Sequence, residues 1–389
     1  MVGTHADSLI AEAVLKLRGT KDFDDKVSER DLEDMWEAVW KDATVPPVGD
    51  GEVRYEDREE NVDYEVRAGL SSVYDSLGWV ADDVHSESAS RTLDYAYDDY
   101  AAYVLALHLN KSQEIMSFLL ERSLMNAFVL FNDKTGFMEA RNKDGTWAGE
   151  DSGWTEGDKW AYSFDVMHDV GGLVARRGGK VKFVRSLDEH FDGGHNDHTN
   201  EPSHHIPYLY AMAGAAWKTQ ERVREIAWSE YGDGPEGLSG NEDCGQMSAW
   251  FIFTAMGFYP VNPVSGEYIV GSPLFESITI HIPNASKPLR IIAKGARTKK
   301  YVKSLTIDGR KVETPVIQHE WIRDGADVVF EMSAEVEGWG GDVGVMREFG
   351  VLKDSDSLIM RGDEDDGERW EDGWDGDSDV GRSRLDDEL

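Results

Sequence analysis

The sequence predicts a mainly α-helical protein that ends in a smaller antiparallel β unit. Apolar residues recur at helical spacing in successive segments up to about residue 256, and from residue 257 they alternate as in strands. Three long glycine-rich loops with clustered polar side chains separate the later helical segments. Helices joined by such loops favour a toroid of helical hairpins with a functional site at one of its openings.

The helical segments are defined by their apolar faces. In the segment 90–109, for example, Leu93, Tyr97, Tyr100 and Val104 recur at helical spacing. The pattern predicts helices over 6–42 (interrupted by a loop at 19–26, with Asp31 capping the second part), 64–76, 90–109, 112–131, 160–176, 180–190, 204–216, 218–231 and 247–257. The predicted loops are 45–62, 132–158, 192–201 and 232–246.

Strand patterns fill the next part of the chain. Short β-favouring runs lie at 268–270, 278–282, 289–293, 302–307 and 328–332, and Asp308-Gly309 is a hairpin turn signal. After them the chain is poor in apolar residues and rich in Asp, Glu and Gly. We therefore expect a helical domain over 1–256, an antiparallel β unit over 257–345 and an acidic disordered tail over 346–389.

The charge balance is strongly acidic. Asp and Glu number 76 against 40 Lys and Arg, which gives a formal net charge of −36. Repulsion between like charges destabilises a compact chain, and salt screens it, so acids spread along the sequence predict a protein adapted to high salt. An acidic interaction tail on an ordinary protein would explain only the C-terminal end. With no basic stripe apparent, we expect no nucleic-acid partner.

Composition also limits the class of protein. The chain is 40% hydrophobic and 11% aromatic, which predicts a folded core, and its one cysteine, Cys244, excludes an intrachain disulfide and a cysteine-based zinc site. We find no apolar run long enough for a membrane span and no visible signal peptide. We therefore expect a soluble protein. The sequence does not decide the compartment: the protein is either cytoplasmic in a cell with high internal salt, or extracellular if the natural N-terminus lies upstream.

Three loop-to-helix junctions carry unusual side chains. The segment 151–160 places Glu156 among aromatic rings, where a carboxyl with a raised pKa could donate a proton; alternatively its acids only cap the next helix. The segment 195–205 offers oxygen donors, Asn200 and Glu201, suited to Ca²⁺, and histidines suited to a transition metal; alternatively these are hydrogen-bonded groups at a helix start. The segment 240–250 contains Asp243 before an apolar helix, again a candidate cap, and Cys244, which we expect to be a buried thiol.

Separated carboxylates, aromatic platforms and the absence of a phosphate-binding loop fit glycoside hydrolysis. An inverting enzyme needs one acid on the leaving oxygen and one base that holds water on the opposite face of the sugar. Glu156 and Asp243 could fill these roles, although spacing alone does not pair them.

Several long motifs, in order along residues 2–340, closely resemble glycoside hydrolase family 92, the calcium-dependent α-mannosidases. They are Ser-Arg-Thr-Leu-Asp-Tyr-Ala-Tyr-Asp-Asp (90–99), Asp-Ser-Gly-Trp-Thr-Glu-Gly-Asp (151–158), Asn-Glu-Pro-Ser-His-His-Ile-Pro-Tyr-Leu-Tyr (200–210), Trp-Lys-Thr-Gln (217–220), Gly-Asn-Glu-Asp-Cys-Gly-Gln-Met-Ser-Ala-Trp (240–250), Gly-Phe-Tyr-Pro-Val (257–261) and Gly-Ser-Pro-Leu-Phe (271–275).

The resemblance implies an (α/α)6 toroid followed by β structure, and an inverting exo-acting α-mannosidase, with α-1,2 linkages as the family expectation. It implies Glu156 as general acid and Asp243 as general base, with Glu242 or Asn241 helping to hold the water. It places Asn200 and Glu201 at the sugar and its Ca²⁺, which would add Lewis-acid and templating roles. Trp154 and His204 join the expected substrate-binding residues, and the expected partner is a mannose-containing oligosaccharide or glycan.

Two departures from the family pattern qualify the resemblance. Ala161 stands where the family usually has Gln, which puts one hydrogen bond to the sugar in doubt. Family members are also considerably longer and begin with a β-sandwich domain and the first toroid helices, so we expect a partial toroid that a separate N-terminal polypeptide could complete. Two alternatives stay open: another inverting toroidal glycosidase, and an inactive or partner-dependent remnant that binds carbohydrate or protein.

Overall fold

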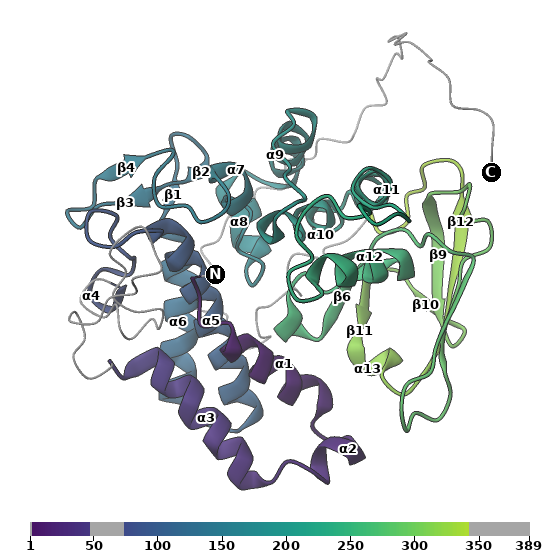
Figure 1. The fold of residues 1–389 in the computed structure, drawn as a ribbon, viewed down its shortest axis with the longest axis horizontal. Coiled ribbons are helices and arrows are strands. Elements are labelled where there is room, and N and C mark those ends of the chain that lie inside the picture. The colour runs from purple at the N-terminus through teal and green to yellow at the C-terminus, as the bar shows by residue number, and fades with distance from the viewer. Residues whose placement is uncertain (1, 47–73, 342–389) are drawn as a thin grey trace. The chain divides into compact units, whose positions relative to one another are not determined.

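The computed structural model describes residues 2–46 and 74–341, as helices followed by a β unit (Figure 1). The helices are α1 (Ala6–Leu17), α2 (Lys21–Asp24), α3 (Glu29–Thr44), α4 (Tyr74–Leu77), α5 (Ser88–His108), α6 (Gln113–Phe128), α7 (Lys159–Tyr162), α8 (Val170–Arg176), α9 (Lys180–Asp192), α10 (Leu209–Met212), α11 (Ala216–Ser229), α12 (Gln246–Met256) and α13 (His319–Ile322). Short 3-10 turns are η2 (Glu201–Ser203), η3 (Ile206–Tyr208) and η4 (Pro263–Ser265).

The strands are β1 (Phe131–Asn132), β2 (Phe137–Met138), β3 (Ala140–Arg141), β4 (Trp147–Gly149), β5 (Phe258–Tyr259), β6 (Glu267–Val270), β7 (Ser277–Ile280), β8 (Leu289–Ile292), β9 (Tyr301–Ile307), β10 (Arg310–Val312), β11 (Val316–Gln318) and β12 (Asp327–Ser333).

Helix α5 lies at the centre of the N-terminal helices and packs against α1, α3 and α6. It is buried along most of its length even though it carries Asp98 and Asp99, both without solvent exposure. Asp99 accepts a hydrogen bond from Arg122 Nε at 2.6 Å, and Asp98 accepts one from the Thr4 backbone N–H at 2.6 Å. Buried carboxylates need such partners, so the contacts to α6 and the N-terminal segment fix how α5 is oriented.

Several predicted helices are shorter than expected. Asp31 is not the N-cap of α3: Ser28 is, and Asp31 completes a capping box with it. The predicted helix 160–176 is divided into α7 and α8, and Asp169 caps α8 by accepting from the Gly172 N–H at 2.8 Å. The predicted helix 204–216 forms η3 and the short α10, because Pro207 lacks the N–H that a continuous helix requires.

The segment 132–158, predicted as a loop, contains paired strands. β1 pairs with β2, and β3 pairs with β4, both in antiparallel register. These strands are two or three residues long, too short for alternation to reveal them in sequence.

The β unit is not purely antiparallel, as the sequence led us to expect. Its five-stranded sheet has the order β10-β9-β12-β8-β7, and β12 runs parallel to β8 while the other neighbours are antiparallel. A second sheet, β11-β6-β5, is antiparallel throughout. The sequence shows the alternation of apolar and polar residues within each strand. It does not show which strands pair, and that pairing decides whether two neighbours run parallel or antiparallel.

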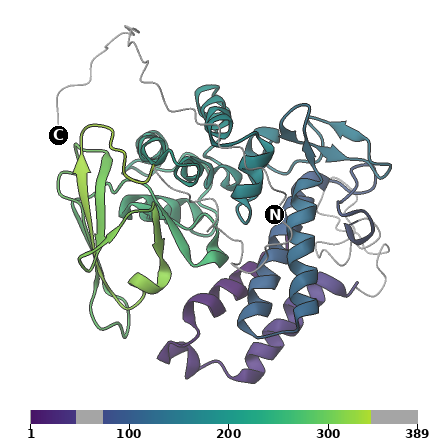
Figure 2. The same cartoon turned by 180° about the vertical axis from the view of Figure 1, so that it is seen from behind.

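A buried arginine joins the helices to the β unit. Arg224 of α11 donates from Nε to Ser272 Oγ at 2.9 Å, and from Nη2 to the carbonyls of Pro273 at 2.8 Å and Ala296 at 2.5 Å. Gln220, one turn earlier, accepts from the Val302 N–H at 3.0 Å. Helix α11 therefore lies against the β unit through buried polar contacts, as the view from behind also shows (Figure 2).

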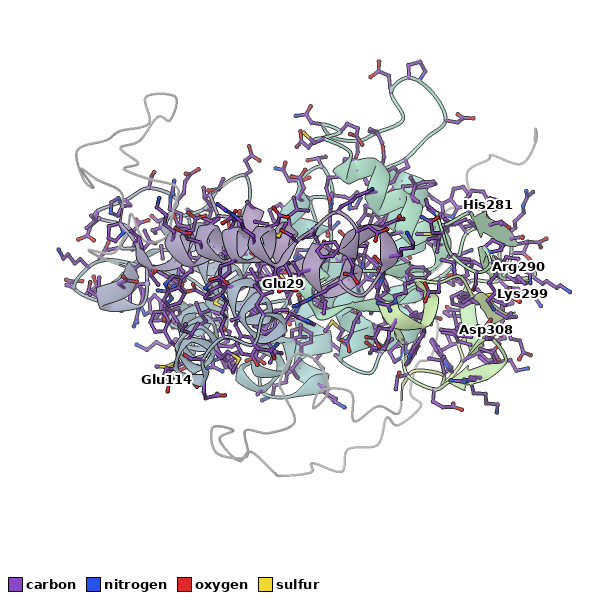
Figure 3. The ribbon with its side chains drawn as sticks, turned by 90° about the horizontal axis from the view of Figure 1, so that it is seen from below. Glu29, Glu114, His281, Arg290, Lys299 and Asp308 are labelled. Carbon is purple, nitrogen blue, oxygen red and sulfur yellow. The ribbon has the colours of Figure 1, made fainter. Side chains whose placement is uncertain are left out.

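The β unit also carries a basic segment that the net charge conceals. Between residues 287 and 311 there are nine Lys and Arg residues and one acid, Asp308. Figure 3 labels Arg290, Lys299 and Asp308 on this unit; Lys299 precedes β9 and Asp308 follows it, and Arg290 forms an ion pair with Asp327 at 2.7 Å. Four of the nine form ion pairs with acids, namely Lys287, Arg290, Lys300 and Lys303, so the expected absence of a basic stripe stays a prediction. The expectation of no nucleic-acid partner stays a prediction that rests on the net charge.

Some expectations lie outside the described residues. They are most of the loop 45–62, most of the predicted helix 64–76, of which α4 represents the end, and the acidic tail over 346–389. Within the parts of the chain that are described, we find no helix with the length and apolar character that a bilayer crossing requires.

Candidate active site

The first candidate segment, residues 151–158, forms a tight loop before α7. Asp158 caps this helix by accepting hydrogen bonds from the N–H groups of Trp160 at 2.8 Å and Ala161 at 3.2 Å. Glu156 lies two residues earlier with a left-handed backbone, at φ +49°, and its side chain is exposed. The capping alternative therefore describes Asp158, while Glu156 has a left-handed backbone that non-glycine residues adopt uncommonly.

The loop is pinned to the first turn of α5. The N–H groups of Ala89 and Ser90 both donate to the Gly153 carbonyl at 3.0 Å, and the Thr155 N–H donates to Ser90 Oγ at 3.0 Å. Gly153 has φ +80°, and a Cβ atom there would meet Ala140 Cβ at 2.8 Å. Only glycine allows the backbone to come this close, and the contact fixes the loop that carries Glu156 against α5.

Trp154 packs within the protein rather than against Glu156. Its ring stacks on Tyr162 with centroids 5.3 Å apart, and its Nε1 donates to the Glu150 carbonyl at 2.9 Å. The expected packing of the Glu156 carboxyl against aromatic rings is therefore not observed, since that side chain is exposed. The face of Trp154 opposite Tyr162 is the surface that a sugar could use.

The second candidate segment meets the first. Asn200 Nδ2 donates to the backbone carbonyl of Glu156 at 2.9 Å, which links two loops 44 residues apart. Glu201 follows as the first residue of η2, and Pro202 occupies the position where a missing N–H costs nothing. This hydrogen bond holds Asn200 and Glu201 next to the predicted general acid.

His204 is enclosed by protein partners. It is 1% exposed, its Nε2 bonds the His198 carbonyl at 3.2 Å, and its Nδ1 accepts from Gln246 Nε2 at 3.2 Å. Burial lowers the pKa of His204 to about 4 and that of His198 to about 3, so both rings are neutral near pH 7. These contacts fit a supporting role for His204 and give no preference to a transition-metal site.

The third candidate segment makes a left-handed turn before α12. Asp243, Cys244 and Gly245 have φ of +46°, +56° and +102° in succession. The Glu242 carboxylate accepts from the Ser248 N–H at 3.1 Å, and hydrogen bonds with the Ser248 side chain and backbone lower the pKa of Glu242. Asn241 and Asp243 are exposed. Cys244 is exposed too, so our expectation of a buried thiol is wrong.

Glu201 is the group at which the three segments converge. Burial raises the pKa of the Glu201 carboxyl, and a hydrogen bond with Asp243 and the negative charges of Asp243 and Glu156 act in the same direction. The structure thus brings Glu156, Asn200, Glu201 and Asp243 into one neighbourhood from three separate loops. Such a group of carboxylates can share protons and hold hydroxyl groups or a cation.

Comparison with known proteins agrees with this arrangement. The model of the glycosyl hydrolase family 92 catalytic domain matches residues 1–334. The chain belongs to glycosyl hydrolase family 92. The structure also resembles a family 92 α-mannosidase from Bacteroides thetaiotaomicron, with 34% identity and a TM-score of 0.74 over 87% of this chain and 43% of that one.

Two further family 92 relatives have similar coverage. An inverting mannosidase of the family from Bacteroides thetaiotaomicron VPI-5482 shares 27% identity, with a TM-score of 0.75 over 88% of this chain and 47% of that one. An uncharacterized secreted glycosidase from Arthroderma benhamiae is 28% identical in a 377-residue alignment that covers 87% of this chain and 46% of the relative. The chain thus spans less than half the length of each of these three relatives.

Calcium is the metal that the family 92 resemblance implies, and the donor chemistry at Asn200 and Glu201 fits it. Asn200 uses its amide nitrogen on the Glu156 carbonyl, which leaves its Oδ1 as an acceptor, and Glu201 adds carboxylate oxygens among other negative charges. Ca²⁺ takes six to eight oxygen ligands. Residues 2–46 and 74–341 contain no group of three or more His, Cys, Asp or Glu side chains set for a metal.

The sequence analysis missed the residues that hold this family 92 site together. Gln246 Nε2 bonds both His204 and the Tyr259 hydroxyl, at 3.2 and 3.3 Å, and so connects the second and third segments. Ser90 fixes the first segment from α5. Gln246 and Ser90 both lie inside motifs that carry the resemblance, which was the available signal, but their partners are distant in sequence.

Proposed function

We propose that the chain forms part of an inverting exo-α-mannosidase that hydrolyses terminal α-mannosides, with α-1,2 linkages the expected target. The observation that carries the proposal is the convergence of Glu156, Glu201 and Asp243, from three loops, around one point. Family membership gives the reaction class, and the similarity to an inverting mannosidase supports the stereochemical course. The helices would form part of an (α/α)6 toroid, and the domains would divide at about residue 256 and again at about residue 345.

Glu156 acts in this proposal as general acid. Its exposed carboxyl group transfers a proton to the glycosidic oxygen as the bond from that oxygen to the anomeric carbon breaks. The hydrogen bond from Asn200 to the Glu156 backbone carbonyl keeps the loop in place during the transfer. The proton from Glu156 ends on the glycosidic oxygen, so the leaving sugar departs with a hydroxyl group.

Asp243 acts as general base. It takes a proton from a water molecule whose oxygen bonds to the anomeric carbon from the face opposite the leaving group, which inverts the configuration. This geometry requires the two carboxyl groups to be separated by roughly 6.5–9.5 Å. Glu242 and Asn241, on the same turn, position that water, and Glu242 stays ionised because hydrogen bonds with the Ser248 side chain and backbone lower its pKa.

Glu201 and Asn200 hold the mannose in place, and they are the residues that would ligate Ca²⁺. The ion, when bound, supplies Lewis-acid stabilisation and a template for two sugar hydroxyl groups. Trp154 offers the ring face opposite Tyr162 to the sugar, and His204 orients Gln246 between the second and third loops.

Mannose release from α-1,2-mannobiose in high salt, with Ca²⁺ present or removed by a chelator, tests the proposal. We expect Glu156→Gln and Asp243→Asn each to reduce turnover by at least about a hundredfold while the folded state persists in circular dichroism. Asp158→Asn, which touches only the helix cap, is the control. Proton NMR of the first anomer released should show β-mannose; an α product, or full activity in either carboxylate variant, would contradict the mechanism.

A further inference from the structure

A second cavity lies beside the candidate active site. It has a volume of about 240 Å³ and is lined by the turn between β1 and β2 and by α7, α8 and α9, which lie together in Figures 1 and 2. Trp160 of α7, four residues after Glu156, forms part of its wall. None of the candidate catalytic residues lines this cavity, so it is separate from the site of the proposed reaction.

Three cationic side chains line the cavity without a counter-ion. Arg176, Arg177 and Lys182 make no ion pair with any described residue, in a chain where 76 acids outnumber 40 basic residues. The lining holds these three cations and two carboxylates, Asp133 and Glu189, so its net charge is positive and attracts anions.

Arg177 is the most enclosed of the three cations. Its Nη2 donates to the Ser163 carbonyl at 3.1 Å, while its Nε is buried and finds no acceptor among the described residues. Burial lowers the pKa of Arg177 to about 10, so the guanidinium is still charged near pH 7. The guanidinium also lies over the Phe164 ring at 4.6 Å, but its buried Nε keeps an unused donor, which an anion in the cavity would satisfy.

The remaining lining is suited to a sugar ring. Trp160 and Phe137 meet edge to face with centroids 4.7 Å apart, and His195 stacks on one face of Trp160 at 3.7 Å. The part of these rings that lines the cavity can contact the C–H groups of a sugar. Asp133 and Glu189 also line the cavity; both are exposed, and Glu189 supports the charged form of Arg177 without contacting it as an ion pair. Carboxylates at the rim can accept hydrogen bonds from sugar hydroxyl groups.

We propose that this cavity binds an acidic sugar, whose phosphate, sulfate or carboxylate group is held by Arg176, Arg177 and Lys182 against the wall of Trp160 and Phe137. The sugar part of the proposal rests on the proposed function, and the oxyanion part does not. The cavity is then an accessory binding site that selects acidic glycans next to the glycosidase loops.

Calorimetric titration of the chain, in a constant salt concentration that keeps it folded, tests the proposal with four probes: mannose, mannose 6-phosphate, glucuronate and inorganic phosphate. We expect mannose 6-phosphate to bind at least about tenfold more tightly than mannose, since charged hydrogen bonds are among the stronger ones. The double variant Arg176→Gln/Lys182→Gln should bind it at least about tenfold more weakly. Lys134→Gln, an exposed lysine that does not line the cavity, should leave the affinity unchanged.

Each outcome has a distinct meaning. Equal binding of mannose and mannose 6-phosphate, or unchanged affinity in the double variant, overturns the proposal. Inorganic phosphate that binds as tightly as mannose 6-phosphate supports the oxyanion part and overturns the sugar part, and the affinity for glucuronate distinguishes a carboxylate from a phosphate preference. Because the readout is binding, failure of mannoside turnover alone leaves this inference standing.

Discussion

Gly153 shows how a single residue positions the predicted general acid. Its carbonyl accepts from the N–H groups of Ala89 and Ser90, and it thereby caps α5, whose own N-cap residue, Glu87, makes no side-chain cap. Its left-handed backbone and its close approach to Ala140 exclude a side chain. The helix start and the loop that carries Glu156 consequently depend on the same glycine.

Gly153→Ala should destabilise the protein by about 2 kcal/mol or more, because a methyl group adds steric conflict to backbone strain. Urea unfolding followed by circular dichroism measures this change. Gly145→Ala is the matched control, since Gly145 has φ +84° but nothing within 4 Å of the added Cβ. Equal losses in the two variants would show that strain alone, and not the contact with α5, matters at Gly153.

Two buried histidines make stability depend on pH. Burial lowers the pKa of His190 and of His204 to about 4, from 6.5 in the unfolded chain. Between these values the unfolded chain binds protons that the folded chain does not, so their contribution is complete above about pH 6.5 and is lost as the pH falls toward 4. Each histidine contributes a slope of up to about 1.4 kcal/mol per pH unit in this window.

We therefore expect the urea midpoint to fall between about pH 7 and about pH 5. The variant His190→Gln should show a shallower fall, because it removes one titrating group whose ring lies among aromatic side chains. Identical pH dependence in the variant and the parent would contradict the assignment.

At the scale of residues, sequence motifs identified the groups but not their surroundings. Glu156 and Asp243 were identified from the sequence motifs that contain them. The exposure of Glu156 and Cys244 could not be predicted in this way, because it depends on which side of each loop faces solvent. Burial raises the pKa of Glu201, and Asp243 and Glu156, which lie 42 and 45 positions away in the chain, act in the same direction. Contacts of this range leave no local signal in sequence.

Among the secondary-structure elements, α11 has the strongest link to a different part of the fold. Arg224 donates three hydrogen bonds to the β unit while 7% exposed, and burial lowers its pKa. Its acceptors, Ser272 Oγ and the carbonyls of Pro273 and Ala296, belong to the segments that flank β7 and β8. The helix and the β unit are therefore expected to unfold together.

Arg224→Met should cost about 3 kcal/mol, because methionine fills the space but leaves buried acceptors unsatisfied. Arg222→Met on the same helix removes partly exposed ion pairs to Asp192 and Glu225 and should cost less than about 1 kcal/mol. Differential scanning calorimetry should show one transition in the parent. A parent that melts in two separate steps would refute the expected coupling.

Long elements were predicted well, and interrupted ones were not. The apolar face of 90–109 predicted α5, and the alternation over 302–307 predicted β9. In both segments many residues follow the same helical or strand periodicity, which makes the pattern clear. Helices α7 and α10 are four residues long, and α10 ends two residues before Gly214, whose φ of +86° leaves the helical region, so a periodic pattern overestimated both. The parallel pairing of β12 with β8 reflects strand order, which only the folded chain defines.

For the whole molecule, charge is the dominant property. The net charge of −36 over 389 residues means that acidic side chains repel one another at low ionic strength. The basic segment 287–311 of the β unit reduces this repulsion locally. The Debye length falls from about 10 Å at 0.1 M salt to about 3 Å at 1 M, so added salt relieves most of the repulsion between exposed groups.

We expect the melting temperature to rise by at least about 10 °C as potassium chloride is raised from about 0.1 M to above 1 M, through this screening. Thermal scans monitored by tryptophan fluorescence measure the change. Substituting sodium sulfate at equal ionic strength separates screening from the general strengthening of apolar burial by sulfate. A melting temperature independent of salt would argue against the proposed salt adaptation.

Cys244 provides a single natural site for chemical labelling of the chain. It is the one thiol in 389 residues, it is exposed, and it follows Asp243 directly in the turn before α12. A fluorophore attached there would sit at the rim of the proposed glycosidase site without any engineered cysteine. The same placement means that storage under oxidising conditions, which links thiols between molecules, would obstruct that rim and mimic inactivation.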